Sequence, residues 1–163
     1  MYTIKLALLR ITQTLVVTML LAIVVVLTAQ IVARYIFEAP LVWSEELVLI
    51  MLLWITFLGS ALVLEARGHI SIDFVVRLMP ERMQRVIQLC TAGLMLVFCA
   101  ALVYGGWLIV QATSGSITPG LKISVAWHYG GTLVGAVLML LISIEQFVNC
   151  VRFAPAHTQP AVA

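Results

Sequence analysis

Charged residues are scarce in this sequence. Only 10% of its 163 residues are Asp, Glu, Lys or Arg, whereas a soluble domain usually carries about 25%. Hydrophobic types account for 63%, and a chain of that composition would expose a large apolar surface if it folded in water. The net charge of +2 is small and spread along the chain, which argues against nucleic-acid binding. The composition therefore predicts an integral membrane protein.

Cysteine and histidine are also few, and they are poorly placed for chemistry. Cys90 and Cys99 lie on one apolar run, about 13 Å apart on a helix, which is too far for a disulfide. His69, His128 and His157 fall in a loop, near a span end and in the tail, so they form no convergent ligand set. GxSxG and phosphate-binding glycine motifs are missing. The sequence predicts no metal, no cofactor and no enzymatic activity.

Four long apolar runs each reach the roughly 20 residues that a membrane-spanning helix needs. They cover residues 11–33, 43–64, 83–110 and 124–151. Lipid offers no partners for backbone N–H and C=O groups, so each run is predicted to be a helix. The first run exceeds the ~7–15 residues of a signal-peptide core and is predicted to be retained. The sequence thus predicts an all-α integral membrane bundle of four helices in one domain, 1–153, with a disordered tail at 154–163.

The distribution of Lys and Arg predicts the orientation. Basic residues that flank the spans concentrate on the cytoplasmic side of a membrane. One side would hold only Arg34 and Lys122, and the other side seven residues: Lys5, Arg10, Arg67, Arg77, Arg82, Arg85 and Arg152. Both termini and the middle loop are therefore predicted to be cytoplasmic. The middle loop, "HISIDFVVRLMPERMQR", is compatible with a short helix in the headgroup region, and its "ISID" stretch also with extended chain.

Glu45 and Glu46 at the start of the second run admit three interpretations. In the first, Ser44 caps the helix and the two carboxylates favour the positive end of its dipole. In the second, one carboxylate forms an ion pair with Arg34 and clamps the outer ends of the first two spans. In the third, a carboxylate couples transport to a proton or cation, although such groups usually lie deep in a bundle.

Small residues predict where helices pack closely. In the fourth span Gly131 and Gly135 have the GxxxG spacing, which allows two backbones to approach. In the second span Gly59 lies on a stripe at helical spacing, formed by Glu45, Leu49, Leu52, Thr56, Gly59, Ser60 and Val63. No span is visibly broken by Gly or Pro at mid-depth, and no central charge is evident, so a self-sufficient transport pathway is not indicated.

Several segments in this order resemble the small membrane subunit, or Q subunit, of tripartite ATP-independent periplasmic (TRAP) transporters. The matching features are Arg34 at the end of the first span, "WSEE" at Trp43–Glu46, "LLWITFLGSA", and "RGHISID" at Arg67–Asp73. The four-span layout and the length also agree.

The resemblance implies a scaffold subunit in the bacterial inner membrane. Its partners would be a large multi-span subunit, which carries the path for sodium-coupled import of organic acids (carboxylates), and a periplasmic substrate-binding protein. It implies structural or interface roles for the matching residues Arg34, Trp43, Glu45, Glu46, Arg67, His69 and Asp73. Two alternatives stay open on the residues alone: a small homodimeric proton-coupled multidrug exporter, and a membrane enzyme or haem protein.

Overall fold

The computed structural model describes residues 2–39, 41–67 and 80–152. Within these ranges the chain forms four helices: α1 (Tyr2–Tyr35), α2 (Val42–Arg67), α4 (Glu81–Thr113) and α5 (Val125–Arg152). All four are long and apolar enough to cross a membrane, which confirms the predicted four-helix membrane bundle. Three helices extend beyond the predicted spans, and α1 does so most, since it begins at Tyr2 rather than near residue 11, whereas α5 is only shifted by one residue. The predicted middle-loop helix and the tail lie outside the described residues.

Hydroxyl side chains are accommodated in these apolar helices by bonds to their own backbone. Thr14, Thr18 and Thr28 of α1 each donate to the carbonyl four residues earlier, over 2.7–2.9 Å. Thr91 of α4 does the same with Ile87. Because lipid provides no hydrogen-bond partner, such internal bonds let a polar residue sit on an exposed helix face at little cost.

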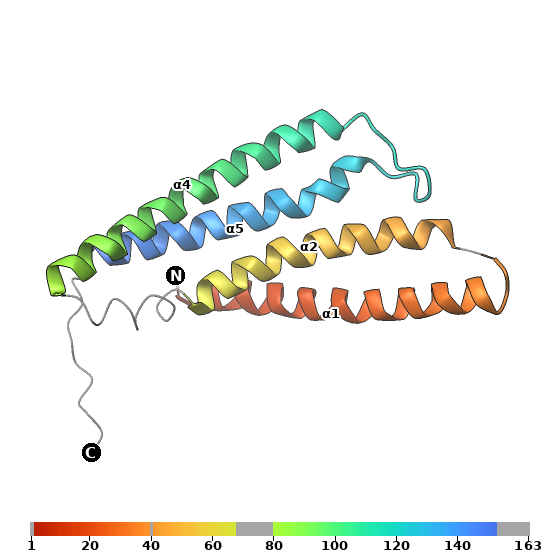
Figure 1. The fold of residues 1–163 in the computed structure, drawn as a ribbon, viewed down its shortest axis with the longest axis horizontal. Coiled ribbons are helices and arrows are strands. Elements are labelled where there is room, and N and C mark those ends of the chain that lie inside the picture. Colours follow the sequence, from red (N-terminus) through yellow and green to blue (C-terminus); the bar gives the residue numbers. More distant parts are fainter. Residues whose placement is uncertain (1, 40, 68–79, 153–163) are drawn as a thin grey trace, which may run out of the picture.

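The helices are arranged in a row rather than in a closed ring. The substantial contacts join α1 to α2, α2 to α5, and α5 to α4, and Figure 1 shows this order across the molecule. The two edge helices are therefore the least covered: about 6% of the most apolar window is buried in α1 and in α4, against 28% in α5. Most of the apolar surface of the edge helices faces outward, where lipid or another protein must cover it.

The core lies where α2, α4 and α5 meet. Ala61 of α2, Cys99 of α4, and Met139 and Ile142 of α5 are buried together. Ser143 of α5 is also almost fully buried. The small side chains of Ala61 and Cys99 allow three helices to approach one point, which larger residues would keep apart.

Helices α2 and α5 approach each other closely at the two glycines of the GxxxG spacing. A Cβ atom added to Gly135 would lie 2.5 Å from the Cβ of Phe57 and 2.7 Å from its carbonyl carbon. One added to Gly131 would lie 2.6 Å from the ring of Trp54. The GxxxG spacing in α5 therefore marks the surface that α2 occupies. In α2 the situation differs, because a Cβ on Gly59 would meet no described atom within 4 Å.

Replacing Gly135 with alanine should destabilise the chain, because the conflict with the Phe57 backbone cannot be relieved by rotating a side chain. We expect a loss of about 1–3 kcal/mol, as for other overpacked sites, seen as a lower midpoint of thermal unfolding in detergent micelles. Gly105→Ala in α4 is the matched control, since its Cβ would meet nothing within 4 Å. Equal midpoints for Gly135→Ala and the wild type would contradict the close packing of α2 and α5.

Candidate functional site

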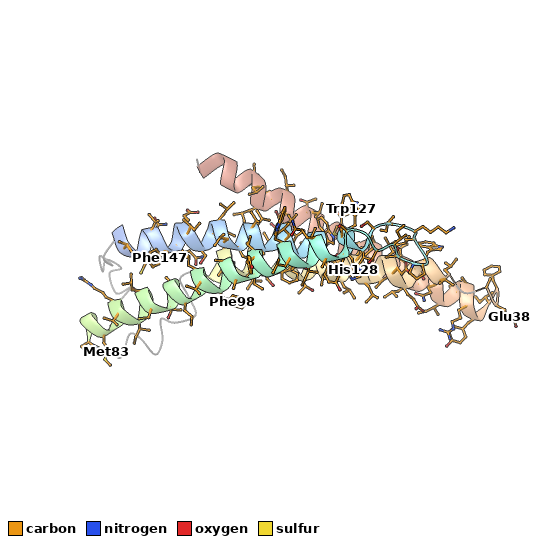
Figure 2. All side chains as sticks on the ribbon, turned by 90° about the horizontal axis from the view of Figure 1, so that it is seen from above. Glu38, Met83, Phe98, Trp127, His128 and Phe147 are labelled. Atoms are coloured by element: carbon orange, nitrogen blue, oxygen red, sulfur yellow. The ribbon has the colours of Figure 1, made fainter. Side chains whose placement is uncertain are left out.

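Polar contacts between distant parts of the chain gather at one end of the row. Here residues 36–41 join α1 to α2, and residues 114–124 join α4 to α5 (Figure 1). We call this the connection end. In Figure 2 Glu38 and Trp127 lie toward it, whereas Met83 and Phe147 lie toward the opposite end. Glu45 stands in the first turn of α2 at the connection end, and Glu46 follows it directly.

The carboxylate of Glu46 binds the backbone of the α4–α5 connection. Its Oε1 accepts from the Gly120 N–H and its Oε2 from the Leu121 N–H, both at 2.8 Å. Hydrogen bonds to a charged acceptor are stronger than those between neutral groups. A Cβ on Gly120 would lie 3.0 Å from the carboxyl carbon, so a glycine suits this position. Glu46 thus fixes the connection to the start of α2.

The connection also has internal bonds. The Thr118 N–H donates to Ile123 O, and the Val125 N–H to Ser116 O, each at 2.9 Å. Between these bonds Lys122 has a φ of 54°, in the left-handed region that costs a non-glycine residue about 1–2 kcal/mol. The bonds on both sides of Lys122, together with the Glu46 tie, hold this unfavourable backbone conformation in place.

Glu45 joins α1 to α2 through Gln30, whose Nε2 donates to Glu45 Oε1 over 3.1 Å. The second interpretation of these carboxylates had assigned that role to Arg34, but within the described residues Arg34 bonds to neither one. The reason is how far along the two antiparallel helices these residues lie. Since residue 30 faces residue 45, Arg34 lies beside about residue 41, before α2 begins. Arg34 is instead exposed.

Ser44 does not cap α2 as the first interpretation assumed. The helix begins at Val42, so Ser44 lies inside the first turn. Its hydroxyl is buried and donates to Leu41 O over 2.6 Å. The neighbouring Trp43 is 41% exposed at the connection end. Of the other residues singled out in the sequence, Arg67 is the last residue of α2, whereas His69 and Asp73 lie outside the described residues.

Two further bonds fasten α2 to α5 on either side of their close approach. The indole N–H of Trp54 donates to Trp127 O over 3.1 Å, near the start of α5. Toward the other end the Gln146 side chain donates to Leu64 O, also over 3.1 Å. Sequence reasoning missed the bonds of Gln30 and Trp54, although a glutamine inside an apolar span is itself a signal that a hydrogen-bond partner is nearby.

Taken together, these contacts describe a small multi-pass membrane protein in which the polar side chains at the span ends join its own elements to one another. Residues 23–153 match the sequence profile of the family "Tripartite ATP-independent periplasmic transporters, DctQ component". The match covers most of the chain, and the chain belongs to this family of small permease subunits. It is accordingly a protein of the inner membrane. The resemblance seen in the sequence is confirmed.

Known relatives include both small and much larger proteins. The chain is 27% identical over 136 residues to the sialic acid TRAP transporter small permease protein SiaQ of Vibrio cholerae, covering 83% of this chain and 79% of that protein. It is 31% identical over 133 residues to the sialic acid TRAP transporter permease protein SiaT of Haemophilus influenzae, covering 81% of this chain. The aligned part is only 22% of the length of SiaT.

Replacing Glu46 with glutamine should release the α4–α5 connection. The glutamine amide turns an NH₂ group toward one of the two backbone donors, so a charge-assisted bond is lost. Since bonds to charged groups are worth about 1.5–3 kcal/mol, protection of the Gly120 and Leu121 amides from hydrogen exchange should fall about tenfold or more. Glu45→Gln is the control, because Glu45 bonds to Gln30 and not to the connection. Unchanged protection in Glu46→Gln would show that the tie does not hold the connection.

Proposed function

We propose that this chain is the scaffold subunit of a sodium-coupled secondary transporter that imports organic acids (carboxylates). It would act with a large membrane subunit, which carries the transport path, and with a periplasmic substrate-binding protein. The observation that supports this proposal is that the polar side chains form hydrogen bonds within the chain itself. Glu45, Glu46, Trp54 and Gln146 all bond to other parts of the same chain.

The middle of the membrane-spanning helices contains no charged side chain with which to bind an ion or a carboxylate. No Asp, Glu, Lys or Arg occurs in residues 11–33, 47–64, 86–113 or 125–144. Transporters usually place such groups, or broken helices, near the centre of the bilayer. A transport path on another subunit is therefore the simpler arrangement, and this chain would support it.

The relatives favour a large membrane partner. The aligned region makes up 22% of SiaT and 23% of the isethionate TRAP transporter permease protein DctMQ of Oleidesulfovibrio alaskensis. In both relatives the region that matches this chain is one part of a much longer permease protein. Units fused in some relatives are expected to be neighbours where they are separate. The names of other relatives refer to sialic acid and a C4-dicarboxylate, which supports an organic acid as substrate.

The orientation in the membrane follows from charge and from aromatic residues. The connection end would face the periplasm, since it carries only Arg34 and Lys122 among the basic residues. The exposed rings of Tyr35, Trp107 and Trp127 toward this end suit the headgroup region of the outer leaflet. Both termini would then be cytoplasmic. Arg34 and Trp43, exposed at the connection end, are candidates for contact with lipid headgroups or a partner subunit.

Reconstitution in liposomes tests this function. With the large subunit, the binding protein and this chain present, uptake of labelled sialic acid or a C4-dicarboxylate should require a sodium gradient. Omitting this chain should reduce uptake at least about tenfold, a loss equivalent to about 1.4 kcal/mol of coupling. The chain alone should move neither substrate, in contrast to the homodimeric proton-coupled exporter considered above. Transport of a drug cation by the chain alone, driven by a proton gradient, would favour that exporter and refute the scaffold role.

A further inference from the structure

One side of α2 is left uncovered by the rest of the chain. It consists of residues at helical spacing, which we call the α2 face: Leu49, Leu52, Thr56, Gly59, Ser60 and Val63. Leu49 and Val63 are 55% and 51% exposed, and a Cβ on Gly59 would meet no described atom within 4 Å. The sequence predicted a packing face along this stripe. Its first residue, Glu45, bonds to Gln30 of α1, whereas Leu49, Leu52 and Val63 further along are exposed.

The centre of the α2 face groups three small residues. The exposed faces of the other helices carry large apolar side chains, such as Val25 of α1, Leu94 of α4 and Leu141 of α5, together with smaller residues such as Thr28 and Thr91. The α2 face has Thr56, Gly59 and Ser60 in its middle, between Leu52 and Val63. Small residues gain little from contact with lipid chains, but they allow another helix to approach closely.

The hydroxyl groups on the α2 face already donate to acceptors within their own helix. Thr56 donates to Leu52 O and Ser60 donates to Thr56 O, each over 2.7 Å. No hydroxyl hydrogen therefore needs a partner, and the oxygens remain able to accept a bond from an opposing helix. This arrangement allows the face to be covered by protein without leaving an unsatisfied donor.

We propose that the α2 face is the surface on which a membrane helix of the large permease subunit packs. The inference rests on the proposed function. The occupant is a membrane helix because the face lies in the middle of an apolar span, and because relatives such as SiaT and DctMQ carry this unit within a much longer permease chain. Since α2 is an inner helix of the row, the partner lies against a broad side of the row rather than at an edge (Figure 1).

The Gly59→Leu variant tests this interface without disturbing the fold of the chain. A Cβ at this position meets no described atom within 4 Å, and leucine favours a helix more than glycine does. With the full-length chain and the large subunit co-expressed, we expect the variant to insert and melt like wild type but to retain about tenfold less large subunit on purification, equivalent to about 1.4 kcal/mol. Gly105→Leu in α4 is the matched control, because Gly105 also has open space and stands beside bulky Tyr104.

Undiminished recovery of the large subunit with Gly59→Leu would overturn the inference, and so would a loss with Gly105→Leu alone. If wild-type chain fails to retain the large subunit at all, the proposed function fails as well. The same experiment therefore distinguishes failure of the proposed α2 interface from failure of the proposed function.

Photo-crosslinking in intact membranes gives a second readout that does not depend on purification. A photoreactive residue in place of Thr56 should form an adduct with the mass of this chain plus the large subunit. The same residue in place of Thr91 is the control, since Thr91 is an exposed threonine of α4 with the same internal bond. An adduct of two copies of this chain, or none at Thr56, would contradict the proposed occupant.

Discussion

The contact of Phe57 in α2 with Gly135 in α5 is the joint on which the rest of the molecule depends. The two backbones meet there so closely that no side chain fits between them. Since α1 packs on α2 and α4 packs on α5, the outer helices are positioned mainly through this central pair. The small core formed by Ala61, Cys99, Met139 and Ile142 lies along the same pair, so the rigidity of the row comes chiefly from its middle.

The bilayer explains why the polar residues take the roles that they have. In hydrocarbon an unsatisfied polar group is costly, so each polar side chain needs a partner close by. The partners of Gln30, Trp54 and Gln146 are a carboxylate and two carbonyls on the neighbouring helix. Glu46 meets two backbone N–H groups of the α4–α5 connection at the edge of the span. A carboxylate used in this way stabilises a fixed geometry, which agrees with a supporting subunit better than with an ion-coupling one.

The sequence predicted the parts of this structure that depend on lipid alone. Span length and the absence of charge identify four helices, and the spacing of Gly131 and Gly135 identifies one close contact. The sequence did not predict the order of the helices in a row, because all four are apolar on nearly every side. One of its three interpretations paired Arg34, rather than Gln30, with Glu45 or Glu46. Which residues of two antiparallel helices face each other depends on the geometry of the short connection between them. The Glu46 tie joins residues more than seventy positions apart, and no local pattern reveals it.

As the proposed scaffold, the chain would be a rigid row that does not change shape while its partner moves a solute. Spin labels at Val25 of α1 and Val97 of α4, both highly exposed, would report the separation of the two outer helices in the assembled transporter. Cys90 and Cys150 would be replaced by serine, and the fully buried Cys99 left in place. We expect one narrow distance distribution that is the same with and without sodium, binding protein and substrate. A distribution that shifts or splits when transport is allowed would show that this chain takes part in the moving step.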